Sequence, residues 1–199
     1  MRPILLILAI AVLIFYVYED GAHSTYPPGV IAPSEPSQSL LGAGKTWQQG
    51  KFRYTAHADF SMRARVLSTE RYYFDSASAV SPMDFAVGWG RMSDQAIIDQ
   101  MGFAQTQRWY RYWPKGREFP IPATEIGLQS ANMHIIPADK QVLKVLRDVR
   151  KGDLISLDGF LVSVFGDGGW RWDSSLTRTD TGNGACEVVL VKSLSIHRR

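Results

Sequence analysis

The alternation of residue types over 52–66 constrains the fold of this chain more than any other feature. Every second residue from Phe52 to Val66 is apolar, and the residues between them are arginine, threonine, histidine, aspartate or serine. A period of two is that of a β-strand with one face on the core and the other on solvent. The segment is therefore predicted to be a long half-buried strand, and the small residues Ala56 and Ala58 mark where it can bend around a barrel.

Further patterns predict a β-rich α+β domain with one main helix. Strands are expected at 72–74, 103–113, 154–165 and 187–196, with a bulge or kink at Gly159. A short helix is expected over 94–101, after Ser93. The main helix is expected to follow Asp139 as its N-cap and to end before Gly152, with an apolar stripe formed by Val142, Val145, Leu146 and Val149.

The resulting order is strand, strand, short helix, strand, helix, strand, strand. It is similar to the order of an OB-type barrel, in which a helix lies between the third and fourth of five strands. The resemblance implies a small closed β-barrel with one main helix. Another compact β-barrel or an α+β sandwich is compatible with the same order and stays open as an alternative.

An uninterrupted apolar run at 4–18 stands at the N-terminus, after Arg2 and before Glu19 and Asp20. This charge pattern predicts a transmembrane signal anchor over 1–18, which contacts the membrane through residues 4–18. The N-terminus is then cytoplasmic and the remainder periplasmic or extracellular, in a bacterial-type inner membrane. Fifteen helical residues reach only about 22 Å, short of a hydrocarbon core of roughly 30 Å. A cleaved signal peptide and a buried core helix therefore remain alternatives.

Residues 19–45 are predicted to be a linker rich in proline, serine and glycine. Four prolines fall within ten residues of this segment, at positions 27, 28, 33 and 36. Such a density favours extended polyproline-II structure and disfavours helix and sheet. The folded part is then expected to be an extracytoplasmic β-rich domain over 46–199.

Charge and cysteine content narrow the possible partners. The chain has 22 Lys and Arg against 19 Asp and Glu, a net charge of +3. This excess is small, so no nucleic-acid partner is expected. One cysteine excludes an intramolecular disulfide and any site that needs several cysteines, and neither a cofactor nor a metal is expected.

Cys186 is the candidate nucleophile of this sequence. A thiol nucleophile needs a base and a group that orients the base; His134 is the candidate base, with Asn132 or Asp180 as its orienting group. An extracytoplasmic β-rich domain with a histidine and a later glycine-rich cysteine resembles an L,D-transpeptidase. That family has serine-x-glycine-cysteine followed by arginine, whereas here Asn183 stands at the serine position, Ala185 at the glycine position, and Glu187 follows the cysteine. The alternative is that Cys186 is a packed, inert residue at the start of the last strand.

The polar loop over 173–184 is the candidate binding segment. Its hydroxyl, carboxylate, amide and guanidinium groups suit an anion, which backbone N–H groups and Arg178 would hold, or a hard cation. The alternative is a long hairpin loop held by Asx and Ser/Thr turns. The candidate binding residues are Asp173, Ser175, Arg178, Asp180 and Asn183.

The strand expected at 103–113 is rich in aromatic residues and arginine. Alternation assigns Arg108, Tyr110 and Tyr112 to one face and Trp109, Arg111 and Trp113 to the other. One of these two faces is expected to pack on the core.

The whole sequence favours a single-pass membrane-anchored binding or scaffold domain, a component of an envelope membrane complex with a protein partner. The alternative function is a cysteine-dependent envelope hydrolase or transpeptidase that uses Cys186 and His134.

Overall fold

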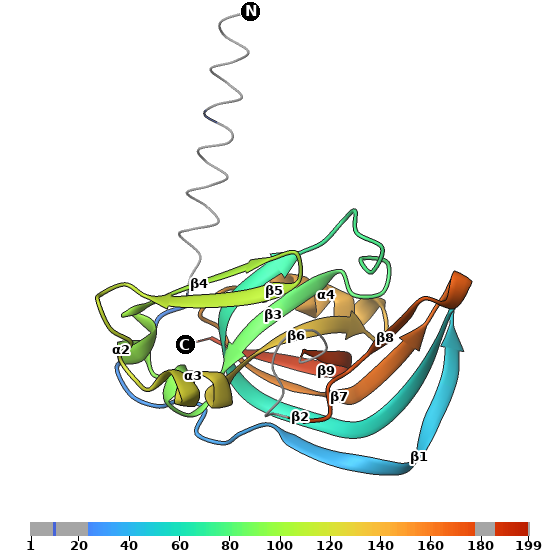
Figure 1. Cartoon of the computed structure of the whole chain (residues 1–199), viewed down its shortest axis with the longest axis horizontal. Coiled ribbons are helices and arrows are strands. Elements are labelled where there is room, and N and C mark those ends of the chain that lie inside the picture. Colours follow the sequence, from blue (N-terminus) through green and yellow to red (C-terminus); the bar gives the residue numbers. More distant parts are fainter. Residues whose placement is uncertain (1–9, 11–23, 178–185, 199) are drawn as a thin grey trace, which may run out of the picture.

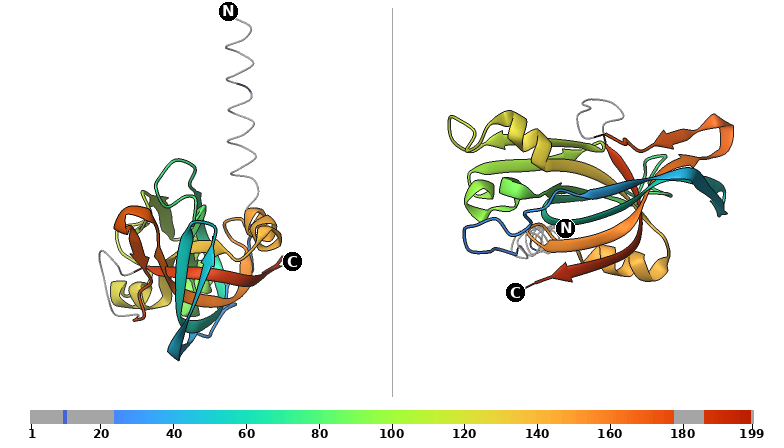
Figure 2. Two further views of the ribbon diagram at one scale, coloured as in Figure 1. Left: turned by 90° about the vertical axis from the view of Figure 1, so that its right-hand side faces the viewer. Right: turned by 90° about the horizontal axis from the view of Figure 1, so that it is seen from below.

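A computed structural model describes Ile10 and residues 24–177 and 186–198 of this chain. These residues form a β-rich domain with few helices (Figures 1 and 2). In chain order its elements are β1 (Ser37–Gln49), β2 (Phe52–Arg71), β3 (Met83–Gly88), α2 (Gln95–Ile98), β4 (Met101–Thr106), β5 (Trp109–Pro114), α3 (Ala123–Gln129), β6 (Ser130–Pro137), α4 (Lys140–Asp148), β7 (Leu154–Phe165), β8 (Arg171–Asp173) and β9 (Glu187–His197).

Seven strands form one sheet in the order β1-β2-β3-β6-β9-β7-β8, and β2 also pairs with β7. The predicted long strand makes this second pairing possible. Residues 53–65 of β2 pair with β7, and residues 65–71 pair with β3. Each of the strands β2, β3, β6, β9 and β7 is therefore hydrogen-bonded to the next, and β7 is hydrogen-bonded again to β2. The sheet thus partly closes into a ring. A register shift between Ala56 and Ala58 lies where the sequence predicted a bend.

The inward side chains of the ringed strands form the main core, which includes Phe60, Phe85 and Met133. Helix α4 joins this core through Val142, Leu146 and the following Val149. Its N-cap is confirmed, because the Asp139 side chain accepts hydrogen bonds from the backbone N–H groups of residues 141 and 142. The predicted strand at 154–165 is also confirmed as β7, with a register shift next to Gly159.

Three other expectations differ from the structure. The segment 72–74 is not a strand, and β3 begins only at Met83. The segment 103–113 is a hairpin of β4 and β5, because Gln107 and Arg108 both have positive φ and the chain reverses there. The short helix α2 covers only four residues, and its N-cap is Asp94.

Residues 24–36 lie against the domain and β1 begins at Ser37, although the sequence predicted a linker over 19–45. Tyr26 and Ala32 are buried in a small cluster with Leu154. Ser24 donates a hydrogen bond of 2.6 Å from its hydroxyl to Oδ1 of Asp153. The apolar run at 4–18 lies, apart from Ile10, outside the described residues. Within the described part of the chain, no helix is long and apolar enough to span a bilayer.

Candidate functional site

A polar cluster lies on the outer face of β3 and β6. Phe85 and Met133 point into the main core, so Asp84, Asn132 and His134 point to the opposite side of their strands. Asp84 and His134 are direct partners in the antiparallel β3–β6 pairing. Residues about fifty positions apart in the sequence are therefore neighbours on one face.

Asp84 is the most deeply buried charge of this cluster, with no exposed side-chain surface. Its Oδ2 lies 2.9 Å from Nδ1 of His134, whose side chain is 6% exposed. The Nδ1–H direction is not aligned with that oxygen, so the contact is one of proximity rather than a hydrogen bond. The other carboxylate oxygen lies 3.1 Å from a guanidinium nitrogen of Arg108. The guanidinium of Arg108 thus compensates the burial of this carboxylate.

Arg108 joins this cluster to the loop over 72–82. Its Nε lies 2.8 Å from Asp75 Oδ2, and its backbone N–H donates a hydrogen bond to the Tyr72 hydroxyl. Its guanidinium carbon lies 4.0 Å from the Tyr72 ring centre and 5.1 Å from that of Trp172. Arg108 therefore anchors the β4–β5 turn to the preceding loop and to β8.

These contacts set the pKa values of two neighbouring groups. Burial raises the pKa of Asp75, but hydrogen bonds and the positive charge of Arg108 outweigh this effect and hold it below its ordinary value. Burial, together with the charge of Asp84, raises the pKa of the Tyr72 hydroxyl above its ordinary range. Tyr72 therefore stays neutral and can accept the hydrogen bond from Arg108.

Asn132 connects the cluster to Cys186. Gln105 of β4 donates a hydrogen bond of 2.6 Å to its side-chain oxygen, which orients the amide. The amide nitrogen then donates to the carbonyl oxygen of Arg108 at 3.0 Å and lies 3.9 Å from the sulfur of Cys186. Of the predicted pair, His134 thus lies on β6, and Cys186 immediately precedes the adjacent strand β9. Asn132 contacts the thiol and Asp84 contacts the imidazole.

The imidazole of His134 is held in a fixed orientation. Its ring centre lies 4.6 Å from that of Trp172 on β8, and Nδ1 faces Asp84. In the tautomer with its hydrogen on Nδ1, the nitrogen beside the Asp84 carboxylate, Nε2 is the acceptor of the ring. His134 is therefore suited to accept a proton or a hydrogen bond from a group that approaches Nε2.

The structure separates the candidate residues of the polar loop. Ser175 lies near Cys186, since its backbone N–H donates to the Cys186 carbonyl oxygen at 3.1 Å. Asp173 lies in another cluster, where it accepts a hydrogen bond of 2.5 Å from Ser163 and contacts Arg171 at 2.7 Å. The remaining candidates, Arg178, Asp180 and Asn183, lie outside the described residues.

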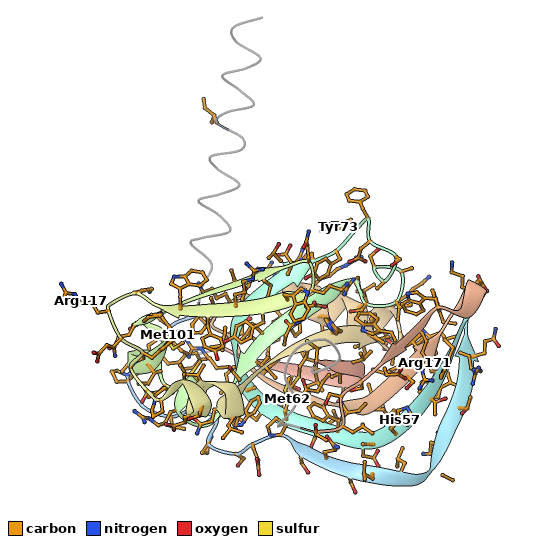
Figure 3. All side chains as sticks on the ribbon, viewed as in Figure 1. His57, Met62, Tyr73, Met101, Arg117 and Arg171 are labelled. Atoms are coloured by element: carbon orange, nitrogen blue, oxygen red, sulfur yellow. The ribbon has the colours of Figure 1, made fainter. Side chains whose placement is uncertain are left out.

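The polar cluster around Asp173 connects strands of the sheet. Ser163 is 2% exposed, and its hydroxyl lies 2.7 Å from Nε2 of His57. Figure 3 labels His57 and Arg171 on the part of the sheet formed by β2, β7 and β8. Because Ser163 donates to Asp173, its oxygen is left to accept from the imidazole. A buried hydroxyl with both roles occupied joins β2 to β8 rather than acting on a ligand.

Sequence reasoning missed Asp84, Arg108 and Trp172. Asp84 had a signal, because it is the one charged residue between Met83 and Val87 in an otherwise apolar stretch. Arg108 had none, since its role depends on the hairpin turn. Among residues 24–177 and 186–198, no group of three or more His, Cys, Asp and Glu side chains is arranged to hold a metal ion.

Comparisons with known proteins give no relative from which a role could be transferred. No family model matches the chain, and neither a curated protein nor a solved structure matches it.

Proposed function

We propose that this chain is a single-pass membrane-anchored protein whose β-rich domain lies outside the cytoplasm and binds a ligand, as part of an envelope complex. The apolar run at 4–18, with a basic residue before it and acidic residues after it, supports the anchor and its orientation. The packing of residues 24–36 on the domain supports a short connection between anchor and domain.

The strand pairings support an OB-type barrel as the architecture of this domain. Taking β2, β3, β6, β7 and β9 as strands one to five, the ring order is 1-2-3-5-4, and α4 lies between the third and fourth strands. OB-type barrels bind ligands on the face of strands two and three and on the flanking loops. In this chain that face is formed by β3 and β6, which carry Asp84, Asn132 and His134.

The observation that carries the binding proposal is the contact between Asp84 and His134. A fully buried carboxylate is costly; here Arg108 compensates it, and its other oxygen lies beside an imidazole that packs on the indole of Trp172. A few oriented polar groups next to an aromatic side chain are typical of ligand sites. The expected ligand group is a hydroxyl, amine or thiol that donates to Nε2 of His134.

An enzyme is the second candidate, because Asp84 and His134 lie on the paired strands β3 and β6, and Cys186 immediately precedes β9, which pairs with β6. In that arrangement His134, with Asp84 beside its Nδ1, would take the proton of the thiol, and the Cys186 sulfur would attack the carbonyl carbon of an amide. The C–N bond would then break to leave a thioester, and the proton held by His134 would pass to the departing amine. Asn132 would hold the sulfur in place.

Two experiments test these proposals. Membrane fractionation should leave the chain in the membrane fraction, and added protease should digest it only from the outer side. Digestion from the cytoplasmic side would refute the topology.

A photo-crosslinker placed at Leu176, which is partly exposed and lies beside Ser175, should give an adduct in cells. The substitution His134→Gln should abolish this adduct. The matched control is the same crosslinker at exposed Leu40 on β1. Identical adducts at both positions would refute a ligand at this face.

A further inference from the structure

The outer face of the β4–β5 hairpin is an exposed aromatic and basic surface. Its inner side chains, Met101, Phe103, Tyr110 and Tyr112, pack against a core cluster. The opposite face presents Trp109, Arg111 and Trp113, and the two indoles are 42% and 47% exposed. The sequence predicted this division for the residues of β5, whereas Arg108, which it assigned to the face of Tyr110 and Tyr112, lies in the turn. Nothing among the described residues covers the outer one.

Both ends of this surface are fixed in place. The indole of Trp113 lies over Gly102 so closely that a Cβ added there would be 2.3 Å from the ring. At the other end, Arg108 holds the 72–82 loop, whose tip carries Tyr73 and Phe74, exposed by 70% and 100%. In Figure 3, Tyr73 and Arg117 lie near the two ends of the domain edge formed by β4 and β5. The exposed aromatics therefore share a structured edge.

The hairpin lies close to the point where the described chain begins. Ser24, Met101, Phe103 and Lys115 line one cavity of about 180 Å³. The six Cα–Cα steps from Tyr18, the last apolar residue, to Ser24 span at most about 22 Å when fully extended. If the run at 4–18 crosses the bilayer, as proposed above, the Trp113 end of the hairpin must lie near the membrane surface.

The charges near this end match an anionic surface. Lys115 and Lys151 line the same cavity, with Asp99 as its one acidic residue, whereas Arg65, which also lines it, is buried. Arg111 lies between the two exposed indoles. Tryptophan and tyrosine favour the membrane–water interface, and basic side chains favour anionic headgroups.

We propose that the surface formed by Trp109, Arg111, Trp113 and the Tyr73–Phe74 tip docks on the anionic headgroups of the bilayer in which the chain is anchored. This inference rests on the proposed anchor. Docking turns the domain so that one edge faces the lipid, and it limits the orientations in which the β3–β6 face meets its ligand.

The test uses the full chain reconstituted in nanodiscs that contain phosphatidylglycerol and a lipid with a nitroxide near its headgroup. Tryptophan quenching by the nitroxide reports docking, and the variants retain all tryptophans. Phe74→Glu with Arg111→Glu should lower the docked-to-undocked ratio by about fivefold or more, the factor expected for one lost basic contact with an anionic surface. The matched control is Leu40→Glu, which changes an exposed apolar residue on β1 and should leave quenching unchanged.

Carbonate extraction of the same membranes separates the two proposals. A chain that resists extraction but shows equal quenching in the double variant and in the wild type is anchored without docking by this surface. A chain that carbonate extracts has no anchor, and the docking argument fails with it. Indoles shielded from aqueous acrylamide in native envelopes but insensitive to the lipid nitroxide would mean that a polysaccharide or protein covers the surface, which also overturns the inference.

Discussion

Replacement of Arg108 by methionine should destabilise the domain far more than the same replacement of Arg111 in the same hairpin. Arg108 is 14% exposed and contacts Asp84, whose side chain is fully buried. Arg111 is exposed on the outer face of β5. The two variants lose the same charge, so their difference measures what the surroundings of Arg108 contribute.

The magnitude follows from the group that Arg108 leaves behind. Removing one partner of a buried ion pair costs about 3–5 kcal/mol. The amide nitrogen of Asn132 still donates to Asp84 Oδ2 at 3.5 Å, which places the expected loss near the lower limit. The contact with Asp75, whose side chain is 37% exposed, adds little because exposed pairs contribute about 0–1 kcal/mol. A loss of about 3 kcal/mol corresponds to a fall in Tm of about 6–12 °C for a domain of this size.

Chemical denaturation of the full chain in detergent micelles, followed by tryptophan fluorescence, provides the assay. Arg111→Met should remain within about 0.5 kcal/mol of the wild type. Asp84→Asn should reduce the cost of Arg108→Met in the double variant by about 1–2 kcal/mol, because no buried carboxylate is then left uncompensated. Equal losses in the two arginine variants, or additive losses in the double variant, would refute the role given to Arg108.

Three further predictions concern other parts of the domain. Burial raises the pKa of Asp153, but its hydrogen bonds with Arg198 and Ser24 outweigh burial and lower this pKa below its ordinary value. The carboxylate therefore stabilises the folded state at any pH above its unfolded pKa of about 3.9. This stabilisation should fade as the pH falls below that value. Asp153→Asn should be less stable than the wild type at pH 7, and the gap should close in acid unfolding curves below pH 4; a constant gap would contradict this linkage. Cys186 should react with a small maleimide more slowly in the folded chain than after unfolding if it is inert, whereas rapid labelling that His134→Gln slows would favour the enzyme. Gly159→Ala should reduce thermal stability by several degrees, because the added Cβ would lie 2.0 Å from the carbonyl oxygen of Leu190, and an unchanged Tm would contradict that close approach.

The sequence predicted those elements whose patterns are long and local. The alternation over 52–66 and the apolar run over 154–165 became β2 and β7, and the Asp139 cap with its apolar stripe became α4. β3 and β6 were missed, because each has at most eight residues and the alternation in β6 is short. The strand β1 was missed because glutamine, glycine and serine make up seven of its 13 residues, and its pairing with β2 stabilises a segment of low intrinsic preference.

The site was partly predictable for a related reason. His134 and Cys186 were identifiable as residue types that can act as base and nucleophile, and the structure places His134 on β6 and Cys186 directly before the adjacent strand β9. Asp84 and Arg108 depend on the β3–β6 register and on a turn with positive φ at two consecutive residues. Neither is visible without the strand pairings, since contacts between residues that are distant in sequence decide both.

Arg108 also connects the candidate site with the proposed docking surface. One guanidinium contacts Asp84 of the site and Asp75 of the loop that carries Phe74. Arg108→Met should therefore weaken lipid quenching and also change the maleimide reactivity of Cys186, because Asn132 donates to the Arg108 carbonyl oxygen and contacts the thiol. The double variant Phe74→Glu with Arg111→Glu should weaken quenching alone, because neither side chain contacts the site. If both variants alter Cys186 reactivity equally, the effect comes from the membrane and not from Arg108.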